Sequence, residues 1–165
     1  MRFNDQIRYP ADPQRVFAMI VDPAFQEAKC VATGALEHEV DVSAADDGSA
    51  VVISTRAMPT DQLPEFVRGF VGGRLTLVET QRWNAPAADG GRTGTITVDI
   101  SGAPIRFSGR LRLEGDADGT TQALDGDLKA AVPLVGGRIE KAAEPALRMG
   151  VRVEGRTGAE WLAQK

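Results

Sequence analysis

The sequence predicts an α+β fold in which an antiparallel sheet of about seven strands curves around one long C-terminal helix. Apolar and polar side chains alternate through most of residues 34–132, which is typical of strands with one buried face. Apolar residues recur every three or four positions after Pro133, which indicates a helix of about 30 residues. At 165 residues the chain has the length of one domain, which we expect to span residues 1–165.

The first three elements are a strand and two short helices. Residues 3–9 alternate apolar and polar side chains and predict a strand with one buried face. Asp12 and Asp22 are each followed by a proline. Aspartate is a good N-cap and proline suits the first helical position. We therefore expect short helices over residues 13–21 and 23–31.

The middle of the chain predicts the remaining strands of the sheet. Turn residues such as those at 46–49 join neighbouring strands into hairpins. The predicted strands are residues 36–42, 51–55, 74–83, 94–100, 105–113 and 121–132. Between the second and third of them, residues 65–71 form either a short helix or an apolar loop.

The C-terminal helix presents one mainly apolar stripe to the sheet. That stripe consists of Val135, Ile139, Ala142, Ala146, Met149, Val153, Thr157 and Trp161. One helix covers only part of a seven-stranded sheet, so the space between them is filled by core side chains or by a ligand. We expect the ligand-binding residues to be Phe3, His38, Trp83, Phe107, Met149 and Val153.

Composition excludes several classes of function. The net charge of −4 gives no overall attraction to nucleic acid or to anionic lipid. No segment has the roughly 18–20 uninterrupted apolar residues of a membrane span, and the first residues lack a secretory signal pattern, so we expect a cytoplasmic protein. One cysteine and one histidine exclude an internal disulfide and the common kind of zinc site. We expect neither a metal ion nor another cofactor.

Two segments resemble a known family. Residues 7–17 read Ile-Arg-Tyr-Pro-Ala-Asp-Pro-Gln-Arg-Val-Phe, residues 21–25 read Val-Asp-Pro-Ala-Phe, and a single long helix follows Leu134. This order resembles the helix-grip fold of the START-like superfamily, which includes polyketide cyclases, plant pathogenesis-related allergens and lipid-transfer START domains. Within it the chain looks closest to a group known only as a domain of unknown function. The resemblance implies a deep apolar cavity between sheet and helix, but no single chemistry.

The sequence contains no recognisable catalytic constellation. Neither a nucleophile elbow nor a phosphate-binding loop occurs, so we assign no catalytic residue. His38 is either a pocket donor or base, or a hydrogen-bonded histidine on the sheet surface or in the core. Glu79 and Gln81 share a strand face with Leu75 and Leu77. If buried they could recognise a polar group, but we expect the strand end to leave the core and both side chains to be solvated.

Three functions fit these observations. The first is noncatalytic binding of a small apolar or lipid-like molecule in the cavity. The second is an interaction module with a filled core, because nine aromatic residues offer little stacking surface; a homodimer paired through a sheet edge fits this function. The third is a cyclase- or dehydratase-like enzyme that uses His38 and Glu79 for acid–base chemistry. We rank binding first and catalysis last.

Overall fold

The computed structural model describes residues 1–164, and its elements follow the predicted order. The strands are β1 (Arg2–Tyr9), β2 (Glu37–Ala44), β3 (Ala50–Pro59), β4 (Arg74–Trp83), β5 (Arg92–Ile100), β6 (Ile105–Asp116) and β7 (Gly119–Ala130). The helices are α1 (Pro13–Ile20), α2 (Pro23–Ala32), α3 (Glu65–Val71) and α4 (Gly136–Gln164). The predicted fold class is therefore confirmed, and residues 65–71 are helical.

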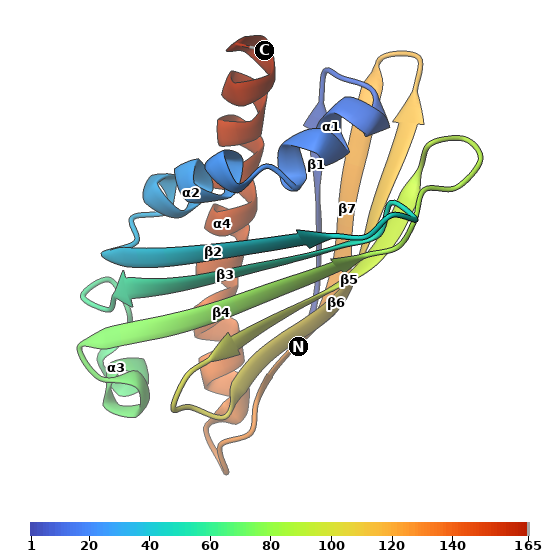
Figure 1. The fold of residues 1–165 in the computed structure, drawn as a ribbon. Helices are drawn as coiled ribbons and strands as arrows, with labels where there is room; N and C mark the ends of the chain where they lie inside the picture. Colours follow the sequence, from blue (N-terminus) through green and yellow to red (C-terminus); the bar gives the residue numbers. More distant parts are fainter. Residues whose placement is uncertain (165) are drawn as a thin grey trace.

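All seven strands form one antiparallel sheet in the order β1-β7-β6-β5-β4-β3-β2. The strands from β2 to β7 pair with one another in chain order, and α3 lies in the connection between β3 and β4. β1 pairs with β7, so the chain must cross from one edge of the sheet to the other before β2 begins. The helices α1 and α2 make this crossing, and α4 runs along the same face of the sheet (Figure 1). This arrangement places β1, α2 and α4 around one interior.

The two short helices begin where local signals predicted. The carboxylate of Asp12 accepts a hydrogen bond from the amide of Arg15 at 2.9 Å, and that of Asp22 accepts from Ala24 at 2.9 Å. Each cap satisfies one of the amides that the first turn of a helix leaves unpaired. Both helices therefore have fixed starts, which orients the buried face of α2 toward the sheet.

Glycine pairs let the sheet bend beneath large aromatic side chains. Gly109 of β6 lies opposite Gly126 of β7. A Cβ at Gly126 would lie 2.3 Å from the carbonyl oxygen of Ser108 and 2.8 Å from the Phe107 ring. The Phe3 and Phe107 rings meet edge to face, with centroids 5.9 Å apart. Glycines covered by aromatic rings are a known means of building curvature into a sheet.

Helix α4 packs on β1, β7 and α2 through a face that includes glycine and a charged residue. Its fully buried residues are Gly136, Ile139, Val153, Gly158 and Leu162. A Cβ at Gly158 would lie 2.5 Å from the Tyr9 ring, so glycine allows close contact with β1. The predicted stripe is right at Ile139 and Val153 but wrong at Ala146 and Met149, which are both exposed; Met149 is 54% exposed. Within residues 1–164 no helix is both long and apolar enough to cross a membrane.

Candidate functional site

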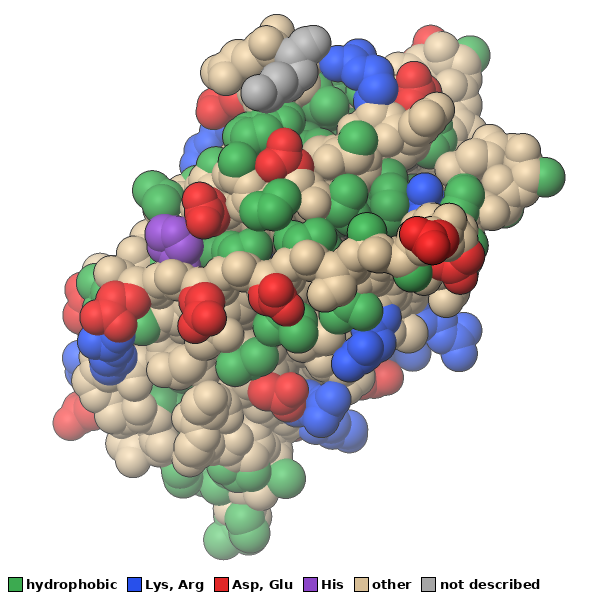
Figure 2. Space-filling view, viewed as in Figure 1, with side chains coloured by type: hydrophobic (Ala, Val, Ile, Leu, Met, Phe, Trp, Pro, Cys, Tyr) green, Lys and Arg blue, Asp and Glu red, His purple; other side chains and the backbone are tan. Residues whose placement is uncertain are grey.

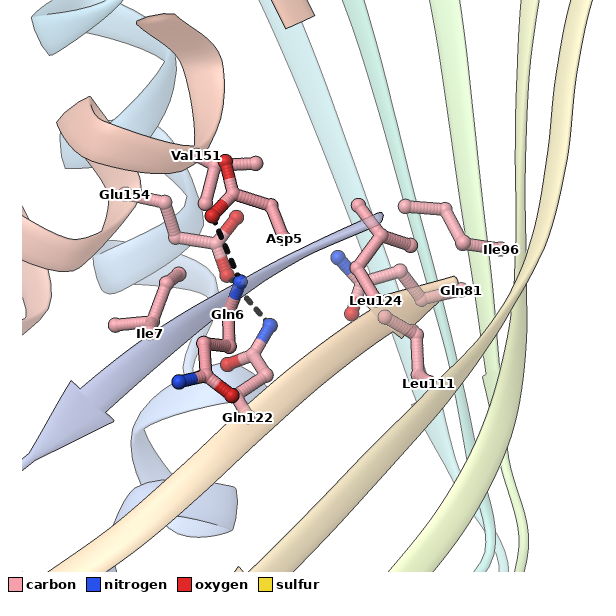
Figure 3. Close-up of a pocket in the computed structure, with 10 residues that line it drawn as sticks. All are labelled: Asp5, Gln6, Ile7, Gln81, Ile96, Leu111, Gln122, Leu124, Val151 and Glu154. Carbon is pink, nitrogen blue, oxygen red and sulfur yellow. Dashed lines mark hydrogen bonds between the residues drawn. The ribbon is translucent and has the colours of Figure 1, made fainter. Parts of the chain in front are cut away.

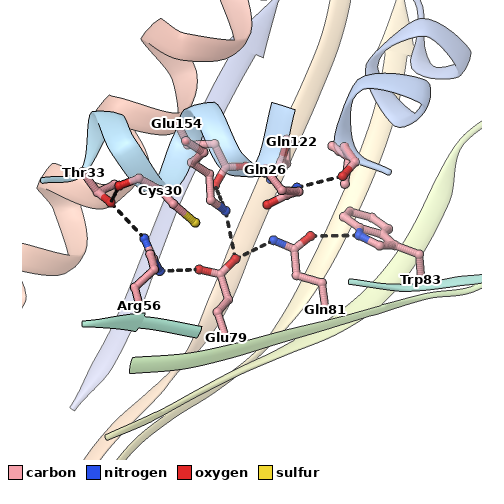
Figure 4. A network of polar contacts seen from close by, with 11 residues as sticks. Gln26, Cys30, Thr33, Arg56, Glu79, Gln81, Trp83, Gln122 and Glu154 are labelled. Carbon is pink, nitrogen blue, oxygen red and sulfur yellow. Dashed lines mark hydrogen bonds and ion pairs between the residues drawn. The ribbon is translucent and has the colours of Figure 1, made fainter. Parts of the chain in front are cut away.

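Four charged side chains from four different elements meet in the interior. Lys29 of α2 donates to Glu79 of β4 at 2.9 Å and to Glu154 of α4 at 3.1 Å. Arg56 of β3 donates to the other Glu79 oxygen at 2.8 Å. The side chains are between 3% and 14% exposed. We call these four residues the ionic cluster; it ties α2 and α4 to the middle of the sheet (Figure 4).

The ionic cluster is balanced, with two cations and two carboxylates. Burial by itself raises the pKa of Glu79, but the charges of Lys29 and Arg56, together with hydrogen bonds, outweigh it and lower this pKa to about 2. Burial lowers the pKa of Lys29, but the carboxylates of Glu154 and Glu79 outweigh it and leave that pKa raised. Both groups are therefore charged at neutral pH.

Two glutamines extend the cluster along the sheet. Gln81 donates to Glu79 at 2.8 Å and accepts from the indole of Trp83 at 2.9 Å. Gln122 of β7 donates to Glu154 at 2.9 Å. The expectation that Glu79 and Gln81 are solvated was wrong, because both are buried. Their charge and polarity are satisfied by partners on other elements, which strand alternation does not reveal.

Several buried polar atoms around the cluster remain without a partner. Within residues 1–164 they include Tyr9 Oη, Gln26 Oε1, Arg56 Nε and Gln122 Oε1. Burial, with a contribution from the charge of Glu154, raises the pKa of Tyr9. A buried polar atom without a hydrogen bond is destabilising, and such atoms are rare in native proteins. Their concentration beside one cluster is the reason that we take this part of the interior as the candidate site.

A small cavity of about 30 Å³ lies next to the cluster, between β1 and α4 (Figure 3). It is lined by Asp5, Gln6, Ile7, Gln81, Ile96, Leu111, Gln122, Leu124, Val151 and Glu154. Because one water needs roughly 10–15 Å³ measured in this way, the space fits about two waters. At its edge Arg148 of α4 contacts the Asp5 carboxylate at 3.4 Å. The cavity thus combines apolar walls with the polar ends of Gln122 and Glu154.

A much larger hollow of about 860 Å³ is open to solvent beside β1, β6 and β7, and it shares Asp5, Gln6, Leu111 and Leu124 with the lining of the small cavity. Its lining includes Arg2, Arg112 and Asp125. Arg2 pairs with Asp125 at 2.6 Å, and Arg112 pairs with Glu114 at 2.7 Å. Exposed pairs of this kind are common on protein surfaces and contribute little energy. We therefore place the candidate site inside the molecule.

The residues expected to bind a ligand separate into two groups in the structure. Phe3, Trp83, Phe107 and Val153 are buried, although the described cavity lining includes none of these four. His38 and Met149 are exposed, and the histidine is visible at the surface in Figure 2. His38 is the second residue of the edge strand β2, and its side chain is exposed. The interior site therefore contains neither of these two residues.

His38 and Glu79 do not form a pair. His38 lies opposite Arg56 on β3, and Glu79 lies opposite Ser54, so β3 runs between the two side chains. Glu79 is buried and held by cations, whereas His38 is in solvent. His38 and Glu79 are therefore not placed to act on one substrate as an acid–base pair.

Three members of the site were missed by the sequence reasoning, although each carried a signal. Lys29 follows Phe25 by four positions and so shares the buried face of α2. Arg56 lies two positions after Ser54 and so shares the inner face of β3 with it. Glu154 precedes the buried Gly158 by four positions on α4. All three lie on the buried face of their helix or strand. Because they are charged, apolar periodicity does not identify them.

A seven-stranded antiparallel sheet that curves around a long C-terminal helix is the helix-grip arrangement of a START-like fold. The chain belongs to the family described as "Protein of unknown function (DUF2505)", whose profile matches residues 5–162. An uncharacterized protein of Mycobacterium tuberculosis, Rv0481c, is 25% identical over 154 residues, covering 86% of this chain and 88% of the relative.

Solved structures show the same fold. A START superfamily protein from Mycobacterium smegmatis has a TM-score of 0.55 at 14% identity, covering 94% of this chain and 96% of the other. Human STARD10 has a TM-score of 0.61 at 6% identity, covering 99% of this chain and 65% of the other. At these identities the likeness concerns the fold. A START-like fold suggests ligand binding in general.

Proposed function

We propose that this protein binds a small, largely apolar molecule between the sheet and α4, without chemical change to it. One observation carries the proposal: a cavity with apolar walls lies against a buried polar cluster that still has unpartnered atoms in the described chain. A filled core gains from pairing all its polar groups. Buried polar groups that lack hydrogen-bond partners beside an internal space suit a binding site, because a ligand can supply the missing hydrogen bonds.

The ligand must widen the cavity, since the present space fits about two waters. Widening by displacement of α4 from β1 is physically reasonable. The contact there uses small residues: a Cβ at Gly155 would lie 3.1 Å from Ile7, and a Cβ at Gly150 would meet nothing within 4 Å among residues 1–164. The pair between Arg148 and Asp5 is partly exposed, and such a pair is weak. Elsewhere α4 is held more firmly, because Glu140 pairs with the Met1 amino group at 2.7 Å and Glu154 pairs with Lys29 at 3.1 Å, so the widening that we propose is local to the part of α4 around Gly150.

Binding without chemistry is supported by the state of Glu79. Its two oxygens accept hydrogen bonds from Lys29, Arg56 and Gln81. With a pKa of about 2 it is ionised at neutral pH and holds no proton to donate. A general acid needs a pKa near the working pH. These contacts give Glu79 a structural role in positioning α2 and α4.

Native mass spectrometry of the purified protein, followed by denaturing extraction, tests the proposal. Val151→Phe fills the cavity from α4, and Met149→Phe adds the same ring two residues away on the exposed side. We expect a stoichiometric apolar passenger, or binding of a member of a panel of fatty acids, fatty alcohols and sterols. The wild type and M149F should bind, and V151F should not. Absence of passenger and panel binding in folded wild type would overturn the proposal.

A second candidate function, an interaction module with a filled core, is favoured by the small volume of the cavity. Self-pairing through the β2 edge is opposed by its acidic residues, Glu37, Glu39 and Asp41, which are exposed (Figure 2). At the other edge, Arg148 of α4 contacts the carbonyl oxygen of Asn4 on β1. Light scattering after size exclusion tests this function: an empty protein that is a stable dimer would favour it over ligand binding.

A further inference from the structure

Taking the proposed function as its basis, the geometry points to a ligand with a neutral hydrogen-bond donor, an apolar alcohol, whose hydroxyl donates to Oε1 of Gln122. Gln122 is 6% exposed and lines the cavity, and its amide nitrogen already donates to Glu154 at 2.9 Å. Its amide oxygen is buried without a partner in the described chain. The unmet need at this position is therefore for a donor.

The other polar groups of the cavity also favour a donor. Glu154 and Asp5 contribute carboxylates, which only accept hydrogen bonds when ionised. Gln81 is already engaged at both ends, by Glu79 and Trp83. Gln6, which is exposed and also lines the cavity, can donate or accept through its amide, but a ligand carboxylate or ether oxygen would still leave the oxygen of Gln122 unpaired. A ligand hydroxyl donates to the amide oxygen of Gln122. Removing the penalty for this buried unpaired acceptor contributes more to the binding free energy than the hydrogen bond itself.

Charge balance selects a neutral donor over a cationic one. Glu154 is paired with Lys29 at 3.1 Å, and Asp5 with Arg148 at 3.4 Å. An ammonium group would add a positive charge to a cluster whose carboxylates already have cationic partners. An uncompensated buried charge is strongly destabilising, whereas a hydroxyl adds none.

Size and wall composition define the rest of the ligand. The present cavity of about 30 Å³ takes a hydroxyl and its first carbon, and the rest of the ligand lies where the cavity widens. The remaining walls are apolar: Ile7, Ile96, Leu111, Leu124 and Val151. A single small donor on a hydrocarbon body matches this division. The chemical class is therefore an alcohol with one hydroxyl.

Four matched probes test the inference: 1-decanol, decyl methyl ether, decylamine and decanoic acid, titrated calorimetrically into wild type and Gln122→Met. Methionine keeps the length of glutamine but removes the amide oxygen. We expect wild type to bind decanol about tenfold or more tightly than the ether, in line with the penalty for a buried unpaired acceptor. In Q122M the two probes should bind equally. If Q122M fails to fold, the order of the four probes in wild type decides alone.

The outcomes separate this inference from the proposed function. Equal binding of alcohol and ether in wild type, or tighter binding of the acid or amine, overturns the alcohol assignment and leaves ligand binding intact. If none of the four probes binds, the extracted passenger decides: one without a free hydroxyl overturns the assignment alone. With neither passenger nor binding probe, both fail. A hydroxylated passenger released by Q122M but kept by Met149→Phe supports both.

Discussion

Replacing Glu79 with glutamine removes one charge from the ionic cluster while keeping the shape of the side chain. Glu154 is then the one carboxylate of the cluster; it pairs with Lys29, and Arg56 loses the carboxylate that it contacts. Their side chains are 3% and 9% exposed, so water cannot replace the lost charge. Removing one partner from a buried ion pair costs about 3–5 kcal/mol. The lowering of the Glu79 pKa from 4.5 to about 2 gives a similar value, about 3 kcal/mol at roughly 1.4 kcal/mol per unit.

The sign of the pH dependence follows from the direction of the shift. Glu79 has a lower pKa in the folded than in the unfolded protein, so its contribution is complete above about pH 4.5 and is lost as the pH falls toward 2. Wild type and E79Q should therefore converge in stability across that window. Lys29 has a raised pKa, so its contribution is lost only as the pH rises above 10.5 and does not interfere.

Urea unfolding measured at pH 7, 4.5 and 3 provides the assay. Asp125→Asn is the matched control: it removes the exposed partner of Arg2 and should cost less than about 1 kcal/mol. Lys29→Met combined with E79Q restores neutrality and should cost less than the sum of the single changes, by about 1–3 kcal/mol. The reasoning is refuted if E79Q costs no more than D125N at pH 7, or if its deficit stays constant down to pH 3.

Three further predictions concern the helices and the edge strand. Gly158→Ala places a Cβ 2.5 Å from the Tyr9 ring and should lower the free energy of unfolding by about 1–3 kcal/mol. Gly150→Ala places a Cβ that meets nothing within 4 Å in residues 1–164 and should raise it by up to about 1 kcal/mol. Equal shifts in the melting temperatures of the two variants would contradict this packing. Asp22→Ala removes a helix cap and should lower the free energy of unfolding by about 1 kcal/mol in urea titrations, so an unchanged midpoint would count against the cap. His38→Ala should change stability by less than about 0.5 kcal/mol, because the side chain is exposed; a larger loss in thermal unfolding would show that it packs in the core.

The order of elements could be predicted because its signals are local. An aspartate followed by proline starts a helix through contacts within one turn, as at Asp12 and Asp22. Period-two alternation identifies a strand whatever its neighbour is. These signals need no knowledge of tertiary packing, which is why seven strands and the long terminal helix were all found.

The candidate site was predicted only in part. Alternation placed Glu79 and Gln81 on the same face as Leu77, and that face is the inner one. Their burial was not foreseen, because the cost of burying a carboxylate is offset by Lys29 and Arg56. These cations are 50 and 23 positions away in the chain. Coulombic and hydrogen-bond partners at such separations are set by packing.

Local sequence signals specify the strand and helix pattern, the helix starts and the fold class. Which face of α4 turns inward depends on tertiary packing. Several sets of residues spaced by three or four positions can form one face of a 29-residue helix, and the set with the most apolar residues includes Met149. The inner set instead includes Glu154 and Gly158, whose burial depends on Lys29 and Tyr9. A charge and a glycine become interior residues only when another element supplies the matching charge or the closely packed ring.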